Sequence, residues 1–242
     1  DNGLELFDLR GASYDDDRWE DLLDEMTVDE MVDLIAFGGH QNIAVSSIDK
    51  IRILDTDGPA GVNSSTLGIF GTGFCSEIIL AQTWNTDLLY DLGLAMGQEY
   101  ADVNNYGVYG PAMNTHRSAF AGRNFEYYLE DGVLAGKLAA AQVNAMATKG
   151  TYNYIKHFAL NDQETNRCAF LLTYSNEQAI REIYLKPFEL CIKNFDGTQI
   201  AVMSSFNWIG TVPACANEDT LTTILRNEWG FQGMVITDYD GS

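Results

Sequence analysis

The sequence predicts an α/β fold of the (β/α)8 TIM-barrel type, and three observations lead to this prediction. Short apolar strands alternate with helical patterns along the chain, which is typical of a parallel sheet with helical crossovers. Polar side chains follow the strand ends, where barrel enzymes carry their sites. The chain has 242 residues, close to the usual barrel length of about 250.

The first residues are expected to lie outside the barrel. Residues 1–17 are interpreted as a linker or entry segment that ends in the acidic turn Asp15-Asp16-Asp17, and residues 18–242 as the barrel domain. A helix is expected from about Arg18. Thr27 and Glu30 have the spacing of a capping box, which predicts that a second helix starts at Thr27.

The remaining elements continue the alternation. A short strand at 51–54 leads into residues 60–75, which are rich in Gly, Ser and Thr and are expected to form a surface loop. Asn85 or Thr86 caps a helix, a strand ends at 108–111, and an alanine-rich helix follows at about 130–148. Strands at 152–158, 200–207 and 234–237 then alternate with helices at 176–192 and 220–229.

Composition narrows the range of partners. The chain has 35 acidic residues against 14 basic ones and a formal charge of −21, which disfavours nucleic acid and anionic lipid and suits a neutral sugar. Hydrophobic residues make up 46% of the chain, so a large core can form. No run of about 18 apolar residues occurs, so no membrane-spanning segment is expected.

The cysteines bear on the cellular compartment. Four cysteines are spread along the chain, without the spacing of a metal site or the density of a disulfide scaffold. They are expected to be reduced and mostly buried thiols, which favours a cytoplasmic location over secretion. No signal peptide is recognisable, but the chain starts at Asp1 rather than at Met. We therefore expect the chain to be part of a longer protein, and whether a targeting segment lies upstream is left open.

The strand ends carry side chains that suit sugar chemistry. Asp238 follows the last apolar strand, and a carboxylate at such a strand mouth is typical of a catalytic residue in a barrel. Other strand ends carry polar side chains of several kinds, namely Asp57, Arg117, Arg123, Lys156, His157 and Asn207. Sugar hydroxyls both donate and accept, so this mixture can hold several of them. A carboxylate among these groups can attack an anomeric carbon, because the transition state there carries positive charge.

Each of these residues also has a common structural explanation. A lone Asp at a strand end more often caps a helix or forms a turn, and a lone Arg is usually part of a surface ion pair. A lone His is most often a satisfied structural residue. Only the joint occurrence at several strand ends favours a binding site.

Several sequence motifs resemble family 3 glycoside hydrolases of the β-glucosidase type. In order, across about residues 20–242, they are Asp57-Gly58-Pro59, Gly122-Arg123-Asn124-Phe125-Glu126-Tyr127-Tyr128, Lys156-His157-Phe158-Ala159-Leu160-Asn161, Glu164 to Arg167, Arg181-Glu182-Ile183-Tyr184, Met203-Ser204-Ser205-Phe206-Asn207, Trp229-Gly230-Phe231 and Thr237-Asp238-Tyr239. One such motif is weak, but eight in the same order are highly specific. The resemblance implies a retaining β-glycosidase that needs no cofactor.

The resemblance also implies residue roles. Asp238 matches the nucleophile that forms a covalent glycosyl-enzyme. The hydroxyl-binding positions are matched by Asp57, Arg123, Lys156 and His157, and Met203 matches an apolar wall of the sugar site. Arg167 matches a supporting charge, Glu164 matches a structural residue, and the peptide bond between Lys156 and His157 is often cis in the family.

Three positions depart from the family pattern within the expected substrate site. Phe206 stands where tyrosine is usual, and Tyr239 stands where tryptophan is frequent. Asn63 lies near the position of a frequent arginine. These differences bear on specificity and rate more than on the class of reaction.

One catalytic group has no counterpart in the sequence. Retaining hydrolysis needs two carboxyl groups about 5–5.5 Å apart. The family resemblance implies that the second, a general acid/base, comes from an α/β sandwich domain that this chain lacks. It also implies that the barrel is incomplete after the nucleophile strand. The substrate is therefore expected to be a glycoside or oligosaccharide carrying a terminal β-D-glucosyl residue, with xylosides, arabinosides and N-acetylglucosaminides as alternatives.

Two other functions stay open. A noncatalytic sugar-binding module could keep the pocket without turnover. A metal-dependent barrel hydrolase could hold Mg²⁺ through Asp55 and Asp57 together with Asp238 and Asp240.

Overall fold

The computed structural model describes residues 2–239, and its backbone divides into two compact units with the boundary between Asp55 and Thr56. The boundary expected between residues 17 and 18 stays a prediction about the domains of the protein. In the first unit Leu9, from the short helical turn Leu6–Leu9, is buried in a small core that also contains Leu22 and Val45.

The first unit contains the two predicted helices. Helix α1 spans Arg18–Leu23 and α2 spans Val28–Ala36. The predicted start at Thr27 is confirmed, because its hydroxyl accepts a hydrogen bond from the Glu30 backbone and the Glu30 carboxylate accepts one from the Thr27 backbone. A short helical turn, Ser46–Ile48, follows, and strand β1 (Gln41–Asn42) pairs antiparallel with β2 (Ile53–Asp57).

The second unit is built on a mainly parallel sheet. Its order is β11-β8-β6-β5-β2-β3-β4, where β3 is Asn63–Ser64, β4 is Ile69–Phe70, β5 is Asn105–Tyr109, β6 is Tyr152–Phe158, β8 is Ile200–Ser204 and β11 is Val235–Ile236. The pairs β5–β6, β6–β8 and β8–β11 are parallel. The predicted α/β class is therefore confirmed. Among residues 2–239 the order runs from β11 to β4 without closing into a ring.

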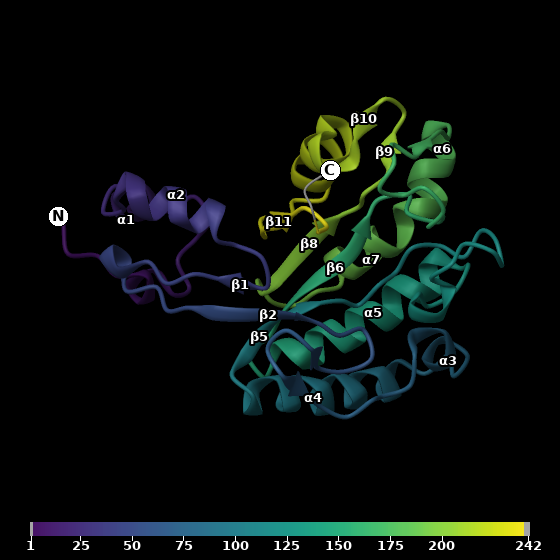
Figure 1. Cartoon of the computed structure of the whole chain (residues 1–242), viewed down its shortest axis with the longest axis horizontal. Helices are drawn as coiled ribbons and strands as arrows, with labels where there is room; N and C mark the ends of the chain where they lie inside the picture. The colour runs from purple at the N-terminus through teal and green to yellow at the C-terminus, as the bar shows by residue number, and fades with distance from the viewer. Residues whose placement is uncertain (1, 240–242) are drawn as a thin grey trace. The chain divides into compact units, whose positions relative to one another are not determined.

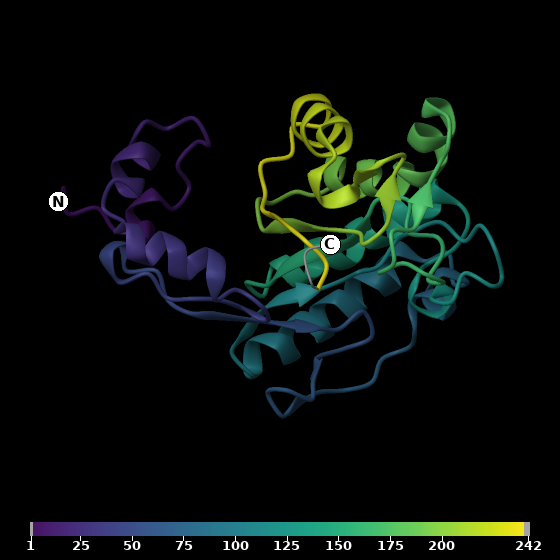
Figure 2. The ribbon, with the colours of Figure 1, turned by 45° about the horizontal axis from the view of Figure 1, so that its top comes forward.

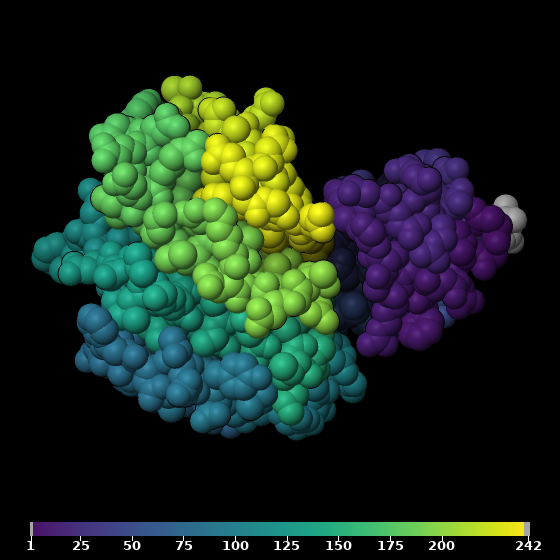
Figure 3. Space-filling view, turned by 180° about the vertical axis from the view of Figure 1, so that it is seen from behind, coloured from purple at the N-terminus to yellow at the C-terminus, as the bar shows by residue number. Residues whose placement is uncertain are grey.

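Helices cover the outer face of this sheet. They are α3 (Glu77–Ala81), α4 (Thr86–Asp102), α5 (Gly132–Ala147), α6 (Glu177–Ala179) and α7 (Lys186–Lys193), with π-helical segments at Ile180–Tyr184 and Asp219–Glu228. In Figure 1 and Figure 2, α4 lies beside α5, and α5 lies beside α7. Figure 3 shows the second unit from behind the view of Figure 1, with the chain order running from blue to yellow.

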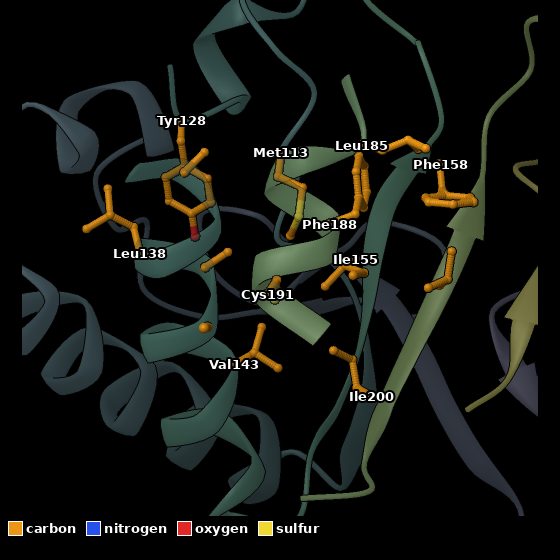
Figure 4. Close-up of a cluster of buried hydrophobic side chains, with 14 of the residues drawn as sticks. Met113, Tyr128, Leu138, Val143, Ile155, Phe158, Leu185, Phe188, Cys191 and Ile200 are labelled. Carbon is orange, nitrogen blue, oxygen red and sulfur yellow. The ribbon is translucent and has the colours of Figure 1, made fainter. Parts of the chain in front are cut away.

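The main core lies between these helices and the sheet. Leu138 and Val143 of α5, Phe188 of α7, and Ile155 and Phe158 of β6 are fully buried together (Figure 4). The Phe158 ring packs edge-on against Phe188, with 5.2 Å between the ring centroids. Burying such large side chains is the main favourable contribution to folding, and it fixes where β6 delivers its last residues.

Several local predictions need correction. Residues 60–75 are not only loop, since they contain the hairpin of β3 (Asn63–Ser64) and β4 (Ile69–Phe70). The strand predicted at 200–207 ends at Ser204, and a small second sheet joins β7 (Leu172–Thr173), β9 (Trp208–Ile209) and β10 (Val212–Pro213). Short helical turns lie at Asn124–Glu126 and Ala214–Ala216.

The expectation of mostly buried thiols is wrong. Cys191 is buried, Cys215 is half-buried, and Cys75 and Cys168 are exposed. Within the described part of the chain, no helix has both the length and the apolarity needed to cross a bilayer.

Candidate active site

The predicted site residues come from the ends of neighbouring strands. Asp57 is the last residue of β2, Lys156 and His157 lie near the end of β6, and Asp238 follows β11 by two residues. The peptide bond between Lys156 and His157 is cis, as the resemblance implies. Because the carboxyl ends of parallel strands meet at one edge of a sheet, these side chains lie near one another.

Asp238 is a mostly buried carboxylate with one uncommitted oxygen. Its side chain is 13% exposed, and its Oδ1 accepts a hydrogen bond of 2.7 Å from the Tyr239 backbone. Its Oδ2 is buried without a hydrogen-bond partner among the described residues. Burial raises the pKa of Asp238, while the Tyr239 hydrogen bond and nearby cations oppose that rise.

The imidazole of His157 lies next to this free oxygen. Its Nε2 is 3.6 Å from Asp238 Oδ2 and 3.1 Å from Nη2 of Arg123. Its Nδ1 is 3.0 Å from the Tyr127 hydroxyl. Burial, followed by the charge of Lys156 and of two arginines, holds the pKa of His157 well below its usual value near 6.5, so the ring is neutral at pH 7.

Arg123 connects His157 to two carboxylates. Its Nε is paired with Glu126, and its Nη1 lies 3.6 Å from Glu164. The guanidinium carbon also lies 5.9 Å from the centre of the Tyr127 ring, within the range of a cation–π contact. Since several groups orient the guanidinium, it can present fixed N–H donors to a ligand.

Arg167 is a second cation beside Asp238. Its Nη1 lies 3.7 Å from Asp238 Oδ2, and its Nε pairs with Glu164 at 3.0 Å. The guanidinium carbon stacks 4.5 Å above the Phe206 ring, which is buried. The structure thus places Phe206 beside the site through Arg167, and the role implied for Arg167 as a supporting charge fits this geometry.

Lys156 is almost fully buried, and burial lowers the pKa of its ammonium group. The negative charges of Glu126, Asp57 and Asp238 oppose that shift. The ammonium group of Lys156 therefore interacts electrostatically with both Asp57 and Asp238, two carboxylates at the ends of different strands.

A cavity of about 470 Å³ opens beside Asp57. The residues that line it include Asp57, Asn63, Glu77, Phe125 and Glu126. Asp238 is not among the residues that line this cavity. The ion pair between Glu126 and Arg123 joins the cavity to the cluster around His157.

Glu77 is a carboxyl group that sequence reasoning missed. It is the first residue of α3, it is fully buried, and its Oε1 accepts a hydrogen bond of 3.1 Å from the Ala112 backbone. Its Oε2 has no hydrogen-bond partner among the described residues. Burial, together with the nearby charge of Glu126, raises the pKa of Glu77 well above its usual value of 4.5, which favours the protonated form of the carboxyl.

We expect the stability of Glu77→Gln, relative to that of the wild type, to increase as the pH rises from 5 to 8. The unfolded state releases the Glu77 proton near its ordinary pKa, whereas the folded state keeps it, so the wild type loses stability as pH rises above about 4.5. Glutamine can accept from Ala112 and has no proton to lose. Unfolding midpoints measured at pH 5 and pH 8 test this, with the exposed Glu130→Gln as control; an equal pH dependence in Glu77→Gln and wild type would contradict it.

Two other predicted residues have different surroundings. Met203 of β8 is buried in a cluster with Tyr109, Tyr154 and Ala201. The Tyr239 side chain is 69% exposed, although its backbone holds Asp238. Their roles in substrate binding stay predictions.

The metal hypothesis gains no support from side-chain geometry. Within residues 2–239, no three His, Cys, Asp or Glu side chains gather as metal ligands would. Asp240, which that hypothesis needs, lies outside the described residues.

Residues that orient the site also escaped prediction. Asn114 bonds the backbone of His157 on both sides, through its Oδ1 at 2.7 Å and its Nδ2 at 2.8 Å. Asn161 donates to the Tyr127 hydroxyl at 3.1 Å. Tyr127 and Asn161 belong to the quoted motifs, so the signal was present, but nothing in the sequence indicated which partner each side chain would meet.

Comparisons with known proteins agree on one family. A model of the glycosyl hydrolase family 3 N terminal domain matches residues 40–241. The chain is 38% identical over 232 residues to Beta-glucosidase A of Butyrivibrio fibrisolvens, covering 92% of this chain and 27% of that protein. It is 36% identical over 227 residues to a Beta-glucosidase of Rhizobium radiobacter, again covering 92% of this chain and 27% of that protein.

Solved structures give the same picture. Beta-glucosidase 3B from Thermotoga neapolitana in complex with glucose superposes with a TM-score of 0.82 at 37% identity, covering 91% of this chain and 33% of that chain. A β-glucosidase from Paenibacillus barengoltzii gives a TM-score of 0.86 at 32% identity, covering 99% and 27%. The chain thus spans about a quarter to a third of these relatives. With its α/β sheet and the matching sequence over residues 40–241, the chain belongs to the family of glycosyl hydrolase family 3 N-terminal domains.

Proposed function

We propose that this domain binds and attacks the terminal sugar of β-glucosides in a retaining hydrolase. The observation that carries the proposal is Asp238, a buried carboxylate at a strand end, whose Oδ2 has no hydrogen-bond partner among the described residues and is flanked by His157 and Arg167. A nucleophile needs an oxygen that is free to form a bond, and the nearby cations Arg167, Lys156 and Arg123 oppose the rise that burial causes in the pKa of Asp238.

The surrounding groups suit a polyhydroxylated ligand. Asp57 offers a carboxylate, while Arg123, Lys156 and His157 offer donors and an acceptor within the same cluster. Relatives named β-glucosidases, one of them solved with glucose, support a glucosyl residue as the bound sugar. Xylosides, arabinosides and N-acetylglucosaminides remain alternatives for the same pocket.

The reaction proposed has two steps. Asp238 Oδ2 attacks the anomeric carbon while a general acid protonates the leaving oxygen, and water then releases the sugar from the covalent ester. The general acid/base is proposed to come from a part of the protein outside these residues, an α/β sandwich domain. The chain covers only 27% of Beta-glucosidase A of Butyrivibrio fibrisolvens, which supports further domains in the whole protein.

Trapping with a 2-fluoro glucoside carrying a good leaving group tests the proposal. The fluorine slows the second step, so the sugar should accumulate on the nucleophile of the full-length protein. Peptide mass spectrometry should then find one added fluoroglucosyl group on Asp238. Binding of the glucoside without any adduct would favour the noncatalytic module, and an adduct on another residue would refute the assignment of Asp238.

A further inference from the structure

The hydrogen bonds around His157 determine which ring nitrogen carries its proton. Arg123 Nη2 lies 3.1 Å from Nε2, and a guanidinium can donate but cannot accept. Nε2 is therefore the acceptor in this contact. The neutral ring then carries its hydrogen on Nδ1, which lies 3.0 Å from the Tyr127 hydroxyl oxygen.

The Tyr127 oxygen is built to accept that hydrogen. It is buried, and Asn161 Nδ2 donates to it from 3.1 Å. Burial raises the pKa of the Tyr127 phenol, so its oxygen stays an uncharged acceptor whose own hydrogen can rotate aside. The hydrogen bond from the Asn161 amide helps to fix the orientation of the Tyr127 phenol.

The position of this proton determines what His157 presents to the carboxylate of Asp238. Nε2 faces Asp238 Oδ2 across 3.6 Å with a lone pair and not with a hydrogen. We propose that Tyr127 is a positioning residue: it holds His157 with its proton on Nδ1, so that Nε2 offers no hydrogen to Asp238. This role rests on the proposed function, in which Oδ2 is the attacking oxygen.

Withholding that hydrogen favours attack. During attack the carboxylate shares an electron pair with the anomeric carbon and loses negative charge. A hydrogen bond from His157 would therefore stabilise the ground state of Asp238 more than its transition state, and the reaction would slow. The other charged groups that face Asp238 are Arg123, Lys156 and Arg167. Of these, Arg123 also donates to His157 Nε2, so it favours the proton on Nδ1 together with Tyr127.

Tyr127→Phe tests the role. Without the hydroxyl, the Nδ1 hydrogen has no acceptor. A hydrogen on Nε2 gains the Asp238 carboxylate as a charge-assisted partner, provided that Arg123 Nη2, which donates to Nε2 in the wild type, turns away. We expect the proton to move to Nε2. The rate of glycosyl-enzyme formation should then fall roughly tenfold at its pH plateau. Its acidic limb should shift to lower pH, because hydrogen bonding to the charged form lowers the pKa of Asp238.

Tyr128→Phe is the matched control. Tyr128 is the neighbouring buried tyrosine, labelled in Figure 4, and its hydroxyl bonds Gln142 Oε1 at 2.7 Å. The Tyr128→Phe variant therefore loses a buried phenol hydroxyl, as Tyr127→Phe does, but one that does not bond His157. The glycosylation rate and acidic limb of Tyr128→Phe should match those of the wild type. If general destabilisation caused the effect in Tyr127→Phe, the control would show it too.

Neutron diffraction from deuterated crystals of the full-length protein reads the proton directly. Deuterium is expected on His157 Nδ1 in the wild type and in Tyr128→Phe, and on Nε2 in Tyr127→Phe. Deuterium on Nε2 in the wild type would overturn the proposal even if Tyr127→Phe failed to fold. So would an unmoved deuterium and an unshifted acidic limb in Tyr127→Phe. Failure of wild-type protein to form the Asp238 adduct would instead refute the proposed function.

Discussion

Asp238→Asn is expected to lower kcat of the full-length protein by roughly 10⁴- to 10⁶-fold, the range seen when a covalent nucleophile is removed. The amide has nearly the shape of the carboxylate but is a far weaker nucleophile, so the covalent step fails while the sugar still binds. Steady-state kinetics on an aryl glucoside measure the loss. Activity within tenfold of the wild type would contradict the assignment.

The same variant should keep its fold or gain stability. Burial raises the pKa of Asp238, which means that the ionised carboxylate is less favourable in the folded state than in the unfolded state. The neutral amide removes this cost at pH 7. A higher unfolding midpoint together with lost turnover therefore separates a catalytic defect from misfolding.

A shorter side chain provides a positive control. Asp238→Gly leaves space beside the anomeric carbon, and added azide or formate can occupy it as an external nucleophile. Partial recovery of the rate with such an anion, together with a glycosyl azide product of inverted configuration when azide is used, is expected. No recovery in Asp238→Gly combined with full activity in Asp238→Asn would place the chemistry elsewhere.

Local sequence signals predicted the regular elements well. Strand β6 lies at the predicted 152–158, and Asn85 caps α4 through hydrogen bonds from Asp87 and Leu88. These outcomes depend on neighbours within a few residues, where alternation and capping act. The hairpin of β3 and β4 was missed, because strands of two residues each carry too little alternation to distinguish them from a loop.

The site was predictable only in part. Motifs identified Arg123, His157 and Asp238, but the contacts that orient them join distant parts of the chain. Tyr127 and His157 are 30 residues apart, and Asn114 and His157 are 43 apart. The burial of Glu77 depends on the same tertiary packing, although a charged residue ahead of the apolar run Ile78-Ile79-Leu80-Ala81 was a visible signal.

Arg123→Ala is expected to lower kcat/KM by roughly 10²- to 10³-fold, because it removes a cation that several partly buried groups share. Glu126 and Glu164 would lose their common partner, and His157 Nε2 would lose its donor. Arg123→Lys should recover only part of the loss, since an ammonium restores charge without the planar fork that contacts all three groups. Kinetics on an aryl glucoside measure both variants.

Arg181→Ala supplies the comparison that identifies the cause. Arg181 also joins two carboxylates, with Nε 2.9 Å from Glu177 and Nη1 2.6 Å from Glu228, but on the outer surface of the second unit. Exposed ion pairs contribute little, so this variant should leave kcat/KM within about twofold. A similar loss in both variants would mean that removing any arginine with two partners damages the protein. A loss in Arg123→Ala alone ties the effect to the cluster that contains His157 and Asp238.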